Sequence, residues 1–245
     1  MTNPNLFAAL AAAFPDDCSA TAIETDSGLF YSWQDLLDAT AMMANLLESL
    51  RLPQGARIAV QVEKSVEALL LYLATLRAGL VYLPLNTAYQ RGEMAYFIQD
   101  AQPAVVVCTG SNFSWISQMA FQAGTAHVFT LNDDRTGTLL QRAAAQPRSH
   151  AVAQVEAHDL AAIIYTSGTT GRSKGAMLSH ANLLSNAQVL KDYWDWRTPD
   201  QGGDVLLHAL PIFHVHGLFV AIHGALLNGS KMIWCSRFDP KTVLR

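Results

Sequence analysis

The 245-residue sequence contains only three cysteines, Cys18, Cys108 and Cys235, which lie far apart and form no CxxC pair. This spacing argues against a disulfide framework and against a zinc site built from cysteine. Lysine and arginine are absent before Arg51, so the sequence shows neither the positive start of a secretory signal nor an arginine-rich transit peptide. Together these features predict a reducing, cytoplasmic location.

Charge and long apolar runs are also scarce. Charged residues make up 15% of the sequence, the formal net charge is -4, and like charges form no block. This balance predicts no nucleic-acid partner. No run reaches the roughly 18 apolar residues that a membrane helix needs, so we expect no membrane partner. Because 51% of the residues are hydrophobic, the composition excludes disorder and allows a sizeable core.

Strands and helices are expected to alternate along the chain. Ser32, Ser65 and Ser179 each precede apolar residues at helical spacing, and we expect each to cap a helix. Continuous apolar runs are typical of strands buried on both faces, and they occur at 81–83, 104–108, 160–165, 205–207 and 232–234; residues 57–62 are also expected to form a strand. A hairpin is expected at 22–32, and further helices at 5–14 and 91–99. This order predicts an α/β fold with a largely parallel sheet covered on both faces.

Three charged residues have ordinary structural interpretations. Lys64 and Glu67 lie near a helix start and are interpreted as solvated charges. Arg172 is interpreted as an exposed loop residue. None of the three is assigned to a site.

The segment Tyr165–Gly175, with the sequence YTSGTTGRSKG, carries the strongest chemical signal. It follows an apolar strand and precedes an expected helix. Glycines allow tight turns that present backbone N–H groups to an anion, the hydroxyl groups add donors, and Lys174 adds a positive charge. These features predict a loop that binds a polyphosphate. The alternative is an ordinary polar turn with small residues.

Two better-known phosphate-binding loops do not match this segment. A Walker A loop has the pattern GxxxxGK[ST], whereas only two residues separate Gly168 from Gly171 and no glycine directly precedes Lys174. The dinucleotide pattern GxGxxG does not match either. The spacing therefore disfavours a P-loop kinase or NTPase.

His214 and His216 form an H-x-H pair. Their side chains would share a face on a strand but not on a helix. One interpretation is a metal site completed by His208 or His223, although no carboxylate or cysteine cluster joins the pair. Another is that one or both are packed, hydrogen-bonded histidines. The residue pattern leaves these alternatives open.

Two motifs in order along the chain resemble those of the acyl-adenylate-forming superfamily, which includes acyl-CoA synthetases, luciferases and peptide-synthetase adenylation domains. Tyr165–Gly175 resembles its phosphate-loop signature over eleven positions, and Ala209–Leu218 resembles a second, downstream motif. Residues 63–68, 82–89 and 208–221 look like those of malonyl-CoA synthetases. The resemblance spans Leu6 to Arg245 and implies layered, largely parallel sheets flanked by helices.

The resemblance implies a two-step ligase reaction that uses ATP, Mg²⁺ and coenzyme A. A carboxylate attacks the α-phosphate of ATP and forms an acyl-adenylate and diphosphate. The thiol of coenzyme A then displaces AMP and forms a thioester. Malonate is the acid implied, and another short or medium carboxylic acid is the alternative.

The resemblance also implies roles for residues of the two motifs. His214 is expected in the acyl-substrate pocket, where an imidazole can bond a carboxylate oxygen, and His216 is a second candidate. No catalytic residue and no metal ligand is assigned. The residues expected to bind the ATP phosphates are Thr166, Ser167, Gly168, Thr169, Thr170, Gly171 and Lys174.

Members of the family are much longer than this chain, so residues 1–245 are expected to be the N-terminal portion of the large AMP-binding domain. Asp239 and Pro240 form a helix-start signal, yet only Lys241–Arg245 follow. We therefore expect a truncated chain without the rest of that domain and without the small C-terminal domain. The corresponding alternative to an active ligase is an inactive, truncated nucleotide-binding module.

Overall fold

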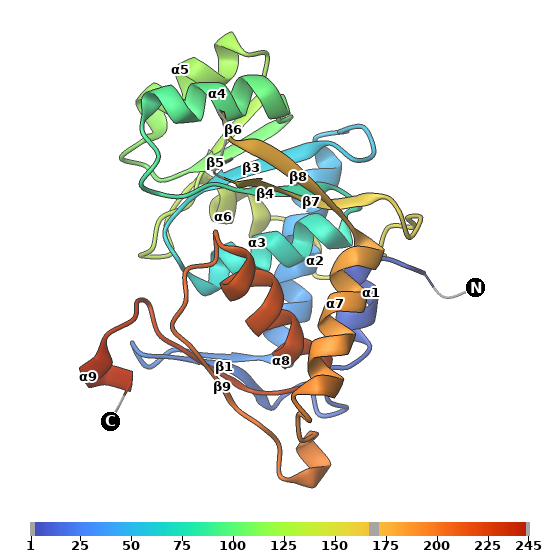
Figure 1. Ribbon diagram of the computed structural model, residues 1–245. Coiled ribbons are helices and arrows are strands. Elements are labelled where there is room, and N and C mark those ends of the chain that lie inside the picture. Colours follow the sequence, from blue (N-terminus) through green and yellow to red (C-terminus); the bar gives the residue numbers. More distant parts are fainter. Residues whose placement is uncertain (1–2, 167–171, 244–245) are drawn as a thin grey trace.

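The computed structural model describes residues 3–166 and 172–243, which form two sheets with helices between and around them (Figure 1). The strands are β1 (Thr21–Thr25), β2 (Phe30–Ser32), β3 (Arg57–Gln61), β4 (Val81–Pro84), β5 (Val105–Cys108), β6 (His127–Thr130), β7 (Leu160–Thr166), β8 (Lys174–Ser179), β9 (Leu206–His208) and β10 (Met232–Trp234). The α-helices are α1 (Leu6–Ala11), α2 (Trp33–Ser49), α3 (Val66–Arg77), α4 (Arg91–Ala101), α5 (Phe113–Gln122), α6 (Thr138–Ala143), α7 (His180–Tyr193), α8 (His223–Leu227) and α9 (Pro240–Val243). A 3-10 turn, η1 (Pro199–Gln201), and a π-helical segment, η2 (His216–Ile222), complete the described elements.

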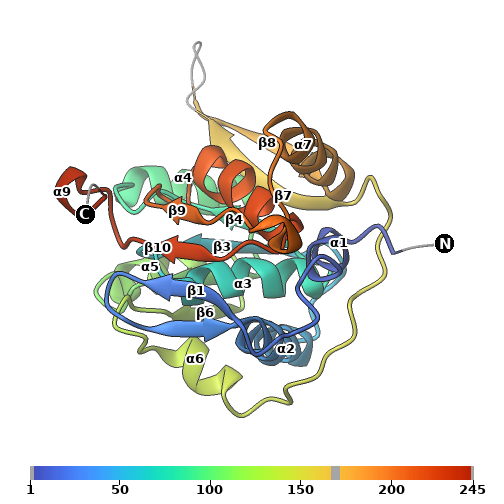
Figure 2. The same ribbon diagram turned by 90° about the horizontal axis from the view of Figure 1, so that it is seen from below.

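Both sheets are mostly parallel. The larger has the order β6-β5-β3-β4-β7-β8, and only β8 runs antiparallel to its neighbour. The smaller has the order β2-β1-β10-β9, in which only β2 is antiparallel. Figure 2 shows β1, β10 and β9 of the smaller sheet side by side. The predicted α/β class with layered, largely parallel sheets is confirmed.

Helices form the layers on either side of the larger sheet. In Figure 1, α4 and α5 cover its outer face, whereas α2, α3 and α8 lie between the two sheets. Every residue of α3 is buried, including Glu67, Thr75 and Arg77. A helix that is buried all round belongs to the centre of a core. The interior between the sheets is therefore the main hydrophobic core, and a second cluster lies under α4 and α5.

The three predicted serine caps are confirmed. The Ser32 hydroxyl accepts from the backbone N–H of Asp35, whose carboxylate accepts from the N–H of Ser32, so α2 begins with a complete capping box. Ser65 and Ser179 cap α3 and α7 in the same way, with side chains that accept from backbone N–H groups three residues on. These short-range signals identified the helix starts correctly.

Several elements were not indicated by the sequence. The most consequential is β8, because it makes the segment after Gly171 a strand rather than a direct entry into a helix. Lys174, Ala176 and Met177 of this edge strand are exposed, so β8 lacks the continuous apolar run of a buried strand. α5 and β6, which lie next to one another in the chain at the edge of the larger sheet, were not indicated either, nor were η1, η2 and α8.

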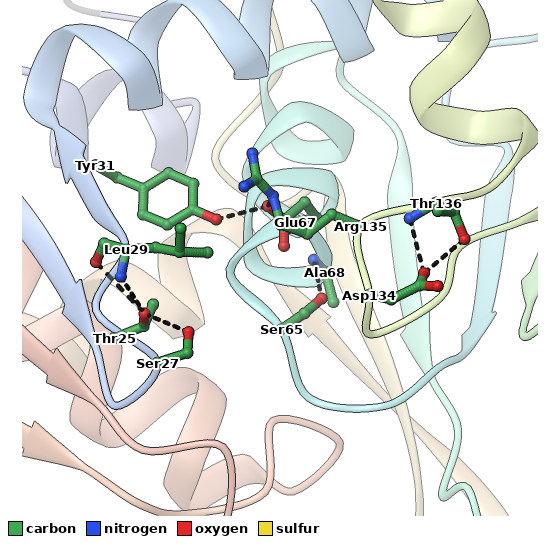
Figure 3. A network of polar contacts seen from close by, with 10 residues as sticks. All are labelled: Thr25, Ser27, Leu29, Tyr31, Ser65, Glu67, Ala68, Asp134, Arg135 and Thr136. Carbon is green, nitrogen blue, oxygen red and sulfur yellow. Dashed lines mark hydrogen bonds and ion pairs between the residues drawn. The ribbon is translucent and has the colours of Figure 1, made fainter.

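The expectation that Lys64 and Glu67 are solvated charges is wrong. Figure 3 shows Glu67 at the start of α3 between Tyr31 of β2 and Arg135. Its Oε1 atom accepts from Tyr31 Oη at 2.7 Å and from Arg135 Nε at 3.0 Å. Burial, followed by the contact with Glu67, raises the pKa of the Tyr31 phenol, which stays protonated and donates. Lys64 is partly buried and donates to two backbone carbonyls, that of His208 at the end of β9 and that of Cys235 directly after β10.

Two general features concern the helices and the cysteines. None of the helices among residues 3–166 and 172–243 is long and apolar enough to cross a membrane. All three cysteines are free thiols, and Cys108 and Cys235 are buried.

Candidate functional site

The two ends of the Tyr165–Gly175 segment form the base of a β-hairpin. β7 ends at Thr166 and β8 begins at Lys174, and these two residues are cross-strand partners. Both side chains are exposed at the end of the larger sheet. The predicted phosphate ligands Ser167, Gly168, Thr169, Thr170 and Gly171 lie outside the described residues, so their roles stay predictions.

Gly175 explains how β8 packs so closely on β7. A Cβ atom at this position would lie 2.9 Å from Cγ2 of Ile163, which is closer than real Cβ contacts allow. The glycine therefore lets the returning strand lie against the buried strand that precedes the loop. This is a packing reason for a glycine that the sequence analysis counted among the phosphate-loop residues.

Helix α4 supports the hairpin base from one side. Tyr96 Oη donates to the carbonyl of Ser173 at 2.7 Å, and the Tyr165 hydroxyl donates to the carboxylate of Asp100. The ring centroids of Tyr165 and Phe97 are 4.5 Å apart. Burial, then the hydrogen bond to Asp100, raises the pKa of Tyr165, so the phenol remains a donor. This support was not predictable, because the α4 residues and the residues they hold are separated by 65 to 77 positions in the chain.

Arg172 also contacts α4, because its guanidinium carbon lies 5.5 Å from the ring centroid of Tyr96. Arginine over an aromatic face is a favourable cation–π arrangement. The side chain is exposed, as expected. Arg172 is thus engaged with Tyr96, and Lys174 is the cation at the hairpin base that is predicted to bind a phosphate.

His214 and His216 lie at the start of η2, not on a strand. His214 is in a bend, its carbonyl accepts from the N–H of Leu218 at 3.0 Å, and His216 is the first residue of the π-helical segment. Both imidazoles are exposed to solvent. They are therefore available to a ligand, and the interpretation that they are packed, hydrogen-bonded histidines is wrong for this pair. π-Helical turns are rare in proteins, and those that occur are often found at functional sites.

The packed histidines are instead His208 and His223. His208 Nε2 lies 3.0 Å from the carbonyl oxygen of Gly217, and His223 Nε2 lies 2.8 Å from Tyr72 Oη. Burial lowers the pKa of His208 to about 4 and that of His223 to about 3, so both imidazoles are neutral at pH 7. Both are engaged in the core and do not join the H-x-H pair. Within the described ranges, no group of three His, Cys, Asp or Glu residues is placed to hold a metal ion.

Gly217 closes the segment 209–216 on itself. A Cβ atom at Gly217 would lie 2.1 Å from the carbonyl oxygen of Pro211. No side chain fits in that space, because the obstacle is backbone. The turn that presents His214 thus depends on a glycine at this position, a role that the motif alone did not reveal.

The hairpin base and the His214 turn follow strands of different sheets. Thr166 ends β7 of the larger sheet, and His208 ends β9 of the smaller. Ligands of α/β proteins bind outside the carboxyl ends of such strands. Among the described residues, no hydrogen bond or ion pair joins residues 165–166 and 172–175 to residues 208–217.

A family model described as AMP-binding enzyme matches residues 7–245 of this sequence. The chain belongs to the AMP-binding enzyme family. Among curated relatives of this chain, the long-chain-fatty-acid–CoA ligase of Bacillus subtilis is 27% identical over 264 residues, covering 96% of this chain and 46% of the relative. A mitochondrial malonate–CoA ligase of Xenopus laevis is 34% identical over 175 residues, covering 68% of this chain and 28% of the relative.

Solved structures show the same relationship in three dimensions. Apo MatB from Rhodopseudomonas palustris is 51% identical with a TM-score of 0.93, and the match covers 99% of this chain and 47% of MatB. The ATP-bound form of the same MatB is 52% identical with a TM-score of 0.93, with coverage of 99% and 47%. The chain therefore spans about half the length of MatB, and about half or less of the two curated relatives.

Proposed function

We propose that this AMP-binding chain contributes the ATP-phosphate and acyl-substrate contacts of an ATP-dependent carboxylate–CoA ligase that acts on malonate. The observation that carries the proposal is the 51–52% identity to MatB over 99% of the chain, together with an ATP-bound structure of that relative. The malonate–CoA ligases of Xenopus laevis and Arabidopsis thaliana support malonate as the acid.

The proposed reaction places negative charge on the ATP phosphates when a carboxylate attacks the α-phosphate and diphosphate leaves. Preorganised donors and cations lower the cost of that charge. Thr166 and Lys174 present a hydroxyl and an ammonium group at the hairpin base. Lys174 is exposed and forms no ion pair with any residue that the structure describes, so its charge is available to a phosphate oxygen. We extend the assignment to the residues 167–171 between them.

His214 is proposed to contact the acid. Its imidazole is exposed on the turn before η2, and a histidine side chain can donate to a carboxylate oxygen. For a dicarboxylate such as malonate, one carboxylate reacts and the other remains available for this contact. His216 lies two residues further along the chain, at the start of η2, and is the second candidate for the same contact.

We further propose that residues 1–245 correspond to the N-terminal part of the large AMP-binding domain of the relatives. Coenzyme A as the acyl acceptor and Mg²⁺ as the companion of ATP belong to the same proposal. The described residues offer no group of three metal-ligating side chains, so no residue here is assigned to Mg²⁺ and no step is derived through it. The three free cysteines support the proposal of a reducing, cytoplasmic location.

One observation favours a second candidate function. The chain covers only 46–47% of the Bacillus ligase and of MatB. A protein of this extent that binds ATP and turns nothing over would be a nucleotide-binding module. A ligase for another carboxylic acid is the remaining alternative, because the Bacillus subtilis relative acts on long-chain fatty acids.

Acid-stimulated exchange between ATP and radiolabelled diphosphate tests the proposed function. The assay is run on the 245-residue chain and on the same chain extended by the second half of Rhodopseudomonas palustris MatB, with malonate, methylmalonate, acetate and a medium-chain acid. Malonate is expected to stimulate exchange most strongly. Exchange by the extended chain alone supports the binding module for residues 1–245. A preference for monocarboxylates contradicts malonate as the substrate.

Replacing Lys174 with alanine is expected to weaken ATP binding by about tenfold, because a charge-assisted contact to phosphate is lost. Isothermal titration of ATP into the 245-residue chain measures the effect. Lys241→Ala is the matched control, since Lys241 is an exposed lysine on α9 and should leave the affinity unchanged. Equal affinities of the two variants would argue against a phosphate contact by Lys174.

A further inference from the structure

Lys64 lies in the short connection between β3 and α3, and its ammonium group bonds two backbone carbonyls. Nζ is 2.8 Å from the carbonyl oxygen of His208 and 2.6 Å from that of Cys235. The same atom lies 4.6 Å from the ring centroid of Trp234. Burial lowers the pKa of Lys64 to about 8, so the group is mainly charged at pH 7. The two carbonyls and the indole ring compensate for the water that this ammonium group loses on burial.

The two carbonyls mark the carboxyl ends of neighbouring parallel strands. His208 is the last residue of β9, and Cys235 directly follows β10. The His208 carbonyl also accepts from the backbone N–H of Cys235 at 3.1 Å. Lys64 itself follows β3 of the larger sheet, so its side chain joins the strand ends of the two sheets. This is the side of an α/β sheet at which ligands bind.

His208 then ties the other end of the segment 209–216. Its Nε2 atom lies 3.0 Å from the carbonyl oxygen of Gly217, and its ring stacks on Trp234 with centroids 4.8 Å apart and planes 21° apart. His208 is 1% exposed. The backbone of this residue is held by Lys64 and its side chain holds Gly217, so both ends of the turn that carries His214 depend on the placement of one residue.

We propose that Lys64 is a positioning residue for the acyl-substrate pocket: it fixes the His208 carbonyl, and through it the turn that presents His214, without contacting the acid. The physical basis is the pair of charge-assisted hydrogen bonds to the strand ends. The link to the acid rests on the proposed function, because it requires His214 to face malonate. The link to the turn is independent of it.

Two variants separate the hydrogen bonds of Lys64 from its packing. Lys64→Met keeps an unbranched side chain of similar length over Trp234 but removes all three N–H donors. Lys64→Arg keeps the charge and supplies donors in a different geometry. Far-UV circular dichroism and urea midpoints establish that both variants fold.

The first measurement is amide hydrogen exchange of the 245-residue chain at pH 7, followed by mass spectrometry. In Lys64→Met, exchange in peptides that cover 209–218 is expected to rise about tenfold, whereas peptides from β3 and β5 keep their rates. Lys64→Arg is expected to restore most of the protection. Unchanged exchange at 209–218 in Lys64→Met, or an equal rise throughout the chain, would overturn the proposal.

The second measurement separates affinity for the acid from affinity for ATP. In the diphosphate-exchange assay, using whichever chain supports exchange, Lys64→Met is expected to raise the KM for malonate about tenfold, with the KM for ATP unchanged and Lys64→Arg in between. An equal change in both KM values, or in neither, would overturn the role in the pocket. If no chain exchanges, the proposed function fails, and the hydrogen-exchange result still decides whether Lys64 positions the turn.

Discussion

Lowering the pH from 7 to 4 is expected to remove most of the stability of this chain, because three neutral histidines are buried in its core. Burial lowers the pKa of His180 to about 4, of His208 to about 4 and of His223 to about 3. The unfolded chain titrates these groups near pH 6.5 and therefore binds more protons than the folded chain between pH 6.5 and 4. The stability that these neutral histidines contribute is therefore fully present above pH 6.5 and is lost progressively as the pH falls towards 4.

The expected loss is on the order of 3 kcal/mol for each histidine at pH 4, since one pKa unit corresponds to about 1.4 kcal/mol. Domains are typically stable by only about 5–15 kcal/mol, so three such groups together are expected to remove a large part of that stability. The contacts explain why protonation is costly. At His180, Nδ1 accepts from the backbone N–H of Leu6 at 3.0 Å, and a proton on this nitrogen would abolish that bond.

Urea midpoints followed by circular dichroism at pH 7.5, 6, 5 and 4 measure this loss. His180→Asn is the informative variant, because its side-chain oxygen can replace Nδ1 as an acceptor but does not titrate. Its midpoint is expected to fall less steeply between pH 6.5 and 4 than that of the unaltered chain. His158→Asn, at an exposed position, is the control and should follow the unaltered chain. A flat midpoint across this range would contradict the prediction.

Replacing Gly217 with alanine is expected to destabilise the chain by about 3 kcal/mol and to displace the His214 turn. The added Cβ would lie 2.1 Å from the carbonyl oxygen of Pro211, and backbone atoms cannot rotate away as a flexible side chain would. The hydrogen bond from His208 Nε2 to the Gly217 carbonyl would be disturbed by the same shift. The substitution thus affects packing and the proposed acid contact together.

Gly92→Ala is the matched control for this substitution. No atom lies within 4 Å of a Cβ built on Gly92, which is in the first turn of α4. Alanine is the better helix former, so the control is expected to be neutral or stabilising by up to about 1 kcal/mol. Thermal and urea unfolding compare the two variants, and malonate-dependent exchange reports on the turn. If Gly217→Ala were as stable as Gly92→Ala, the close approach to Pro211 would be wrong.

Much of the fold follows from signals that lie within a few residues of one another. The caps at Ser32, Ser65 and Ser179 were predictable because a hydroxyl bonds an N–H group three residues on. The buried strands β3, β5 and β7 were predictable because strands covered on both faces are predominantly apolar. β8 was not, because an edge strand with exposed residues has no such pattern.

The site shows the same division. Thr166, at the start of the predicted phosphate loop, lies at the end of a buried strand, as expected, and His214 and His216 are exposed, while their contact with the acid stays a prediction. The support of the loop by Tyr96 and Asp100 was not foreseen, since these residues lie far from the loop in the chain. The roles of Ser167, Gly168, Thr169, Thr170 and Gly171 remain predictions.

The sequence by itself determined the fold class, the family and the two motifs, because each is written in local spacing or in an ordered string of residue types. Only the tertiary structure decided what Lys64 and Glu67 do. Glu67 is buried against Tyr31 and Arg135, and Lys64 against the ends of β9 and β10, each brought from a distant part of the chain. A charge is buried only where partners compensate its lost hydration, and those partners are assembled by the fold.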